Sequence, residues 1–230
     1  MDLLARIATR TSQVENSFLA QRRGMALLGA IFPAAFLASS FLLRRTGFQT
    51  SISAYYWTFD LERNFFVGVL CAIGIFLALY KGYTRFEDWV LNAAGVCAVG
   101  VAFFPIDRSG DCVSSGISAH GAFAVAFFAC IAYICVSMSE KSLEGVADLG
   151  KQAKFRWAYK LCAGVMIACT ALAVLSRLLP KDYIQRLCEH HAIFWLEATG
   201  IWTFSFFWYI KTRELDPSIS WIPLRRRSKA

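Results

Sequence analysis

The chain has 230 residues, of which 57% are hydrophobic and 17% charged, and its mean hydropathy is +0.47. A soluble domain of this length cannot bury so much apolar surface, which argues against a water-soluble enzyme. The 24 Lys and Arg against 16 Asp and Glu leave a net charge of +8. Membrane topology accounts for this excess, so nucleic acid is not an expected partner.

The first 23 residues place Leu3, Leu4, Ile7 and Val14 among arginines and polar residues. This pattern predicts a short amphipathic helix on the membrane surface, not a span. The apolar run that follows has about twenty residues, which exceeds the hydrophobic part of a signal peptide, so no cleavage is expected.

Six apolar stretches follow, each long enough to cross a bilayer as a helix, which takes about twenty residues. They run approximately over residues 24–43, 64–80, 89–105, 119–138, 159–180 and 191–210. We therefore expect an all-α fold, a bundle of six transmembrane helices within one integral membrane domain over residues 1–230. The six spans occupy 24–210, and a basic tail follows at 211–230.

Basic residues are divided unequally between the two sides of the membrane. The head, the second and fourth connections and the tail hold seventeen Lys and Arg, against seven on the other side. The positive-inside rule then places both termini in the cytoplasm, and the basic run at 225–229 predicts attraction to anionic lipid at that face. We expect a multi-pass protein of a cell membrane, of bacterial inner-membrane type, and leave open whether it forms a homo-oligomer.

Titratable residues gather at the non-cytoplasmic ends of the spans. His120 opens the fourth span, whereas His190 and His191 open the sixth. Glu197 lies two turns inside the sixth span, on the helix face of His190. A carboxylate at that depth usually faces the bundle interior with a partner, here Arg177 or His120.

The first outer connection, residues 51–63, is too aromatic for a solvated loop. It predicts either an aromatic belt at the membrane interface or a lid over a site between helices. The candidate lipid- or ligand-binding residues are Ser53, Tyr55, Tyr56, Asn92, Asp107 and Arg177.

Three kinds of chemistry remain open for this outer cluster. Histidine and carboxylate bind divalent metal, but there is no His-x-x-x-His pattern and the ligands would come from three spans, so a metal stays open as a disfavoured alternative and the cofactor is unknown. A lipid hydrolase or acyltransferase would use His120, His190 and Glu197 as acid and base. Its nucleophile would be Ser51, Ser53, Ser118 or Tyr55. A proton- or ion-coupled transporter would use Glu197, although no inverted halves are evident in the sequence.

Packing and cysteine patterns add further expectations. Gly68-x-x-x-Ala72 predicts a close helix contact, and Pro33 a kink in the first span. Of the eight cysteines, only Cys112 and Cys188 fall in outer connections, which predicts a disulfide between them if that compartment is oxidising. The bulky inner half of the sixth span is expected to face lipid: Trp202, Phe204, Phe206, Phe207, Trp208 and Tyr209.

Short motifs along most of the chain resemble the superfamily of damage-regulated autophagy modulators and FGF-receptor-activating proteins, and related bacterial six-span proteins. They are Ser51-Ile52-Ser53, residues 91–95, Phe104-Pro105, His120, and Glu197 followed by Phe204-Ser205-Phe206-Phe207. The resemblance implies a six-helix bundle with cytoplasmic ends. Some members of the superfamily remodel the lipid of GPI anchors or organise membrane lipid and vesicle traffic. Its matching positions are Ser53, Asn92, His120 and Glu197.

The best-supported interpretation is therefore a polytopic membrane protein whose outward-facing polar cluster contacts lipid headgroups, in handling or organising membrane lipid. The sequence leaves open whether the protein is an enzyme.

Overall fold

The computed structural model describes residues 2–44, 46–107, 118–143 and 149–215, and this part of the chain is all-α, with no strand. Its α-helices are α1 Asp2–Leu37, α2 Asp60–Leu79, α3 Arg85–Phe103, α4 Ala119–Leu143, α5 Leu149–Ser176, α6 Lys181–Glu189 and α7 Ala192–Leu215. A π-helical turn, η1 (Ala38–Leu42), continues α1, and a 3-10 helix, η2 (Ser53–Trp57), precedes α2.

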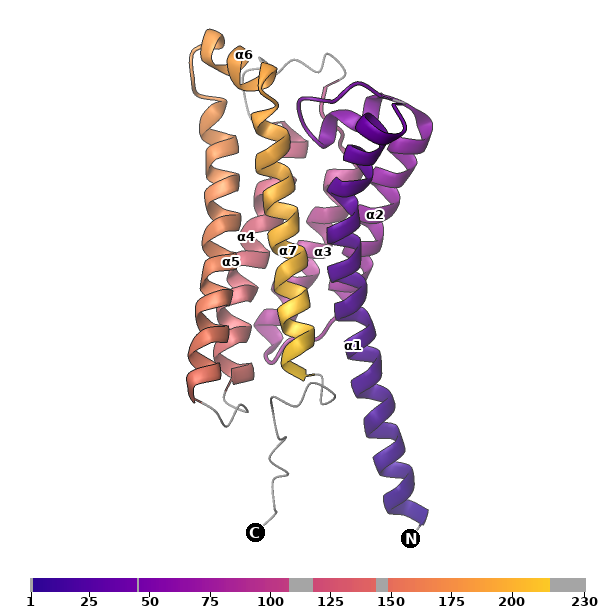
Figure 1. The fold of residues 1–230 in the computed structure, drawn as a ribbon. Helices are drawn as coiled ribbons and strands as arrows, with labels where there is room; N and C mark the ends of the chain where they lie inside the picture. Colours follow the sequence, from indigo (N-terminus) through magenta and orange to yellow (C-terminus); the bar gives the residue numbers. More distant parts are fainter. Residues whose placement is uncertain (1, 45, 108–117, 144–148, 216–230) are drawn as a thin grey trace.

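Six long helices stand side by side and alternate in direction (Figure 1). They form a ring in the order α1, α2, α3, α4, α5, α7, which closes where α7 packs on α1. We call the end that carries η2 and α6 the upper end, and the end where α1 begins and α7 stops the lower end (Figure 1). Since α1 begins where α7 stops, the two ends of the described chain lie on the same side of the bundle.

Five of these helices are long and apolar enough to cross a membrane, over Asn16–Leu42, Asp60–Leu79, Arg85–Phe103, Ala119–Leu143 and Leu149–Ser176 in the described chain. The chain is therefore a polytopic membrane protein. The sixth expected span corresponds to α7, which completes the ring but is not among the five. Glu197 and the Trp, Tyr, Ser and Thr residues of α7 lower its hydropathy.

The head of the chain differs from its expected form. Instead of a separate surface helix, α1 runs without interruption from Asp2 to Leu37 and projects below the other helices (Figure 1). Arg22 holds the helix to the bundle at this point, because its side chain is buried and hydrogen-bonds Tyr80 and the carbonyl of Lys211. Pro33 lies inside α1, and the π-helical turn follows it.

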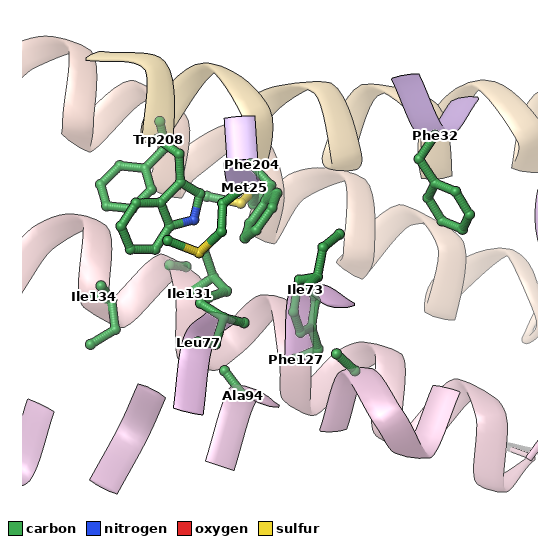
Figure 2. Close-up of a cluster of buried hydrophobic side chains, with 14 of the residues drawn as sticks. Met25, Phe32, Ile73, Leu77, Ala94, Phe127, Ile131, Ile134, Phe204 and Trp208 are labelled. Atoms are coloured by element: carbon green, nitrogen blue, oxygen red, sulfur yellow. The ribbon is translucent and has the colours of Figure 1, made fainter. Parts of the chain in front are cut away.

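The core fills the centre of the ring and includes part of the aromatic face of α7. Figure 2 shows Trp208 and Phe204 beside Met25 of α1, with Leu77 and Ile131 nearby. The expectation that the aromatic residues of α7 all face lipid is therefore wrong. α7 lies between α1 and α5, so one of its faces is core, formed by Phe204, Phe207 and Trp208, whereas Phe206 and Tyr209 are exposed.

Small residues allow a close crossing of α2 and α3, although not where Gly68 predicts it. A Cβ built on Gly68 meets nothing within 4 Å. Gly74 of α2 and Gly95 of α3 instead face each other, and a Cβ on either residue would lie 2.8 or 2.6 Å from the opposite carbonyl oxygen. Side chains at these two positions would force the backbones apart.

Candidate functional site

A cavity of about 200 Å³ lies at the upper end, lined by residues 50–53 and by helices α1, α2, α3, α4, α5 and α7. Its apolar lining includes Phe32, Phe66, Leu70, Phe127, Phe128, Leu196 and Ile201. Its polar lining includes Ser51, Ser53, Asp107, Ser118, His120, Arg177 and Glu197. The cavity is thus amphipathic, with its polar groups gathered at one end of the bundle.

The polar lining is organised around a hydrogen bond between Ser53 and His120. Ser53 Oγ lies 2.8 Å from Nε2 of His120, and both side chains are buried. Nδ1 of His120 lies 3.0 Å from the carbonyl oxygen of Phe104. Since a carbonyl oxygen only accepts, Nδ1 carries a proton, and a neutral His120 presents the lone pair of Nε2 to the Ser53 hydroxyl. The imidazole is thereby held in the orientation of a general base.

Glu197 forms the other half of this arrangement. Its Oε2 accepts hydrogen bonds from the backbone N–H of Ile52 (2.7 Å) and of Ser53 (3.3 Å). Its Oε1 lies 3.4 Å from Ser53 Oγ. Ser53 therefore lies between His120 and Glu197, and its hydroxyl can donate a hydrogen bond to either of them. The expected pairing of Glu197 with His120 is made indirectly, through this hydroxyl.

The segment before η2 is held against the first turn of α7. The backbone N–H of Phe194 donates to the carbonyl of Thr50 (2.9 Å), and Nδ1 of His191 donates to the carbonyl of Gln49 (3.0 Å). His191 itself has a left-handed φ of 52°, which turns the chain from α6 into α7. These contacts bring Ser53 and Glu197, 144 residues apart, to one point.

Two tyrosines of the aromatic connection pack into the bundle, whereas Trp57 and Phe59 of the same connection are exposed. Tyr55 is fully buried, its ring stacks on Phe36 at 4.6 Å between centroids, and its hydroxyl hydrogen-bonds Ser40. Tyr56 packs against the rings of Trp57 and Phe66. Both predicted tyrosines therefore anchor η2, and neither is among the residues lining the cavity.

The remaining predicted residues separate into two groups. Asp107 and Arg177 line the cavity with Ser53, His120 and Glu197. His190 is exposed at the end of α6 and does not line it, and Asn92 lies in the lower half of α3, about 9 Å along the helix axis below Ala98 of the cavity wall. His190 was placed with Glu197 because one helix was expected to hold both. The turn at His191 divides that helix.

The structure bears on the disulfide prediction at Cys188. Among the described residues, no group of three or more His, Cys, Asp or Glu side chains is arranged to hold a metal ion. Cys188 is disulfide-bonded, whereas the six other described cysteines are free. Its predicted partner, Cys112, lies outside the described residues, as does the basic run at 225–229.

Sequence reasoning missed a second buried polar cluster, at the lower end. Lys211 is fully buried and donates to Glu214 (3.0 Å) and to Ser142. Glu214 also accepts a hydrogen bond of 2.6 Å from the hydroxyl of Tyr159. Arg22 lies alongside, bonded to Tyr80 and to the carbonyl of Lys211. The i, i+3 spacing of Lys211 and Glu214 after an apolar helix was the only signal of this cluster in the sequence.

Comparison with known proteins finds no matching family model, no matching curated protein and no matching solved structure. What this polytopic membrane protein does must therefore be argued from its own geometry.

Proposed function

We propose that the upper cavity binds the headgroup and upper acyl chain of a membrane lipid, and that the protein handles or organises membrane lipid. The observation that carries the proposal is the amphipathic lining, which combines apolar side chains with Ser53, His120, Asp107, Arg177 and Glu197. A lipid combines these two characters in one molecule. Arg177 would suit a phosphate, and the Ser53–His120 pair a hydroxyl or ester oxygen.

Membrane orientation follows from the distribution of charge. Basic residues concentrate toward the lower end, where α1 and α7 have their termini, so we assign the lower end to the cytoplasm. The cavity then faces the other side of the membrane. We assign the protein to the cell membrane, with six crossings, and to the bacterial inner membrane by the resemblance to bacterial six-span proteins.

Reporter fusions test this orientation. A reporter that is active only in the cytoplasm should work after Ala230 and fail in the third connection near Arg108. Activity near Arg108 would reverse the orientation and move the cavity to the cytoplasmic face.

Lipid binding is tested by filling the cavity. Ala173 of α5 lines it, whereas the adjacent Leu172 is exposed and does not. In the purified full chain, Ala173→Phe should lower co-purified lipid and the retention of added phospholipid by native mass spectrometry several-fold. Leu172→Phe should leave both unchanged. Equal retention by the two variants, with both folded by circular dichroism, would contradict the proposal.

A second candidate function, lipid acyl transfer or hydrolysis, is favoured by the 2.8 Å contact between Ser53 Oγ and His120 Nε2. In this reaction Ser53 Oγ attacks an ester carbonyl carbon while its proton passes to Nε2. The imidazolium then protonates the leaving alcohol, and the acyl group remains on Ser53 until water or a second alcohol removes it. His190 has no part in this scheme.

Ser53→Ala separates the two functions. It should abolish release of fatty acid from an ester lipid while lipid retention falls by no more than about tenfold, because one neutral hydrogen bond contributes about 0.5–1.5 kcal/mol. Thr170→Val, which removes another hydroxyl from the cavity wall, is the matched control and should leave turnover unchanged. A wild-type protein without turnover would leave binding alone as the function.

A further inference from the structure

A second hollow lies on the outside of the bundle, in the lower half of the α1–α7 contact and away from the upper cavity. It is a groove of about 640 Å³ whose apolar walls include Leu27 and Ala30 of α1 and Trp202 and Phe206 of α7. Leu27 and Phe206 are more than half exposed, so the groove is open to the surroundings of the helices. In a membrane protein those surroundings are acyl chains.

The floor of this groove is rigid because α1 and α7 are hydrogen-bonded along it. Ser205 Oγ donates to the carbonyl of Ala26 (2.6 Å), and Trp202 Nε1 donates to the carbonyl of Ala30 (3.2 Å). Gly29 allows this approach, since a Cβ there would lie 3.0 Å from the Cβ of Ser205. The two helices are therefore held close together along the base of the groove.

Two arginines stand at its lower mouth. Arg23 of α1 and Arg213 of α7 are both exposed and line the groove, and Arg213 lies over the ring of Tyr209 at 5.8 Å. The neighbouring Arg22 has the opposite role, since it is buried and bonded to Tyr80 and Lys211. Of the adjacent residues Arg22 and Arg23, only Arg23 lines the groove.

The length of the groove matches one leaflet. From Trp202 to Arg213 the helix rises roughly 16 Å at 1.5 Å per residue, and half of a bilayer's hydrocarbon core is about 15 Å thick. A lipid whose headgroup lies between the arginines would thus place one acyl chain along the groove as far as Trp202. Arginine pairs bind phosphate with charge-assisted hydrogen bonds, and positive charge at this level favours anionic lipid.

We propose that the lower α1–α7 groove is a binding site for an anionic glycerophospholipid of the leaflet at the lower end. Arg23 and Arg213 bind its phosphate, and the wall from Leu27 to Trp202 accommodates one acyl chain. This site is separate from the upper cavity and does not depend on the function proposed for that cavity.

The test measures lipid retention by the full chain, using native mass spectrometry with phosphatidylglycerol and phosphatidylcholine as probes. Wild type should retain phosphatidylglycerol preferentially. The double variant Arg23→Gln/Arg213→Gln should reduce that retention by roughly thirtyfold, as expected for two arginine–phosphate contacts. Lys154→Gln/Arg156→Gln is the matched control, because both residues are exposed at the lower end of α5 and lie off the groove. It should behave as wild type.

A second variant fills the groove without changing its charge. Ala30→Phe should lower phosphatidylglycerol retention while both arginines remain. This variant keeps the test decisive if the double arginine variant does not fold. An equal loss in the α5 control, or no preference for phosphatidylglycerol in wild type, would overturn the proposal. A third outcome would also overturn the proposal: wild type retains no lipid but forms a dimer, and the double arginine variant is monomeric. The groove would then bind a second copy of the chain.

Discussion

The two ends of the bundle each bury a polar cluster, and the clusters differ in what surrounds them. At the lower end Lys211, Glu214 and Tyr159 contact one another, and none of the three lines either hollow described above. At the upper end Ser53, His120 and Glu197 are equally connected but border a cavity. Burial of polar groups is therefore a sign of function only where a space for a ligand adjoins them.

This comparison predicts different costs for removing a charge. Removing a charge from the lower cluster should destabilise the protein, because the oppositely charged partner is left buried and unpaired. Removing a charge from the upper cluster should destabilise the protein less and weaken ligand binding more.

The largest expected effect is that of Lys211→Met. Glu214 would remain almost fully buried without its cation, which costs about 3–5 kcal/mol. Thermal unfolding in detergent measures this loss. Lys160→Met, at an exposed position of α5, should change stability by less than about 0.5 kcal/mol. If Lys211→Met were as stable as this control, the lower cluster would not contribute to the stability of the fold.

The disulfide-bonded Cys188 gives the next largest effect. Cys188→Ser should lower stability by about 2–4 kcal/mol without reductant and should make unfolding insensitive to reductant. Cys162→Ala removes a free thiol in the lower half and should leave reductant sensitivity as in wild type. Peptide mapping under non-reducing conditions should identify Cys112 as the partner. A free Cys188 thiol in protein purified without reductant would refute the prediction.

Tyr159→Phe tests how much the hydrogen bond from Tyr159 to Glu214 contributes to stability. It removes the hydroxyl that donates to Glu214 at 2.6 Å and should cost about 1–3 kcal/mol, since the carboxylate is buried. Tyr133→Phe is the control, because that ring is 44% exposed. Equal unfolding temperatures for the two variants would mean that Lys211 alone satisfies Glu214.

The smallest expected loss of stability is that of Glu197→Gln, about 1 kcal/mol, because the amide oxygen of glutamine still accepts from the N–H groups of Ile52 and Ser53. Lipid retention in the upper cavity should nevertheless fall several-fold. The double variant with Ser53→Ala should be less than additive, since Glu197 and Ser53 share a hydrogen bond. A loss as large as that of Lys211→Met would make the upper cluster structural as well.

The sequence predicted the helical class, the approximate limits of five spans and the helix that completes the ring. These follow from apolar runs, because a backbone in hydrocarbon must satisfy its own hydrogen bonds. It also singled out His120 and Glu197, since titratable residues within apolar helices are costly and therefore stand out. Ser53 was singled out by the family resemblance instead.

Other features were decided by the tertiary structure alone. The approach of Ser53 to Glu197, the exclusion of His190 by the turn at His191, and the burial of Trp208 all depend on how the ring of helices closes. The lower cluster also depends on how the ring closes. In the sequence, Lys211 and Arg22 resemble ordinary basic residues at the ends of spans, and only the packing of α1 on α7 brings them together. Apolar periodicity specifies which segments are helices, but the neighbours of each helix face are set by packing between segments far apart in the chain.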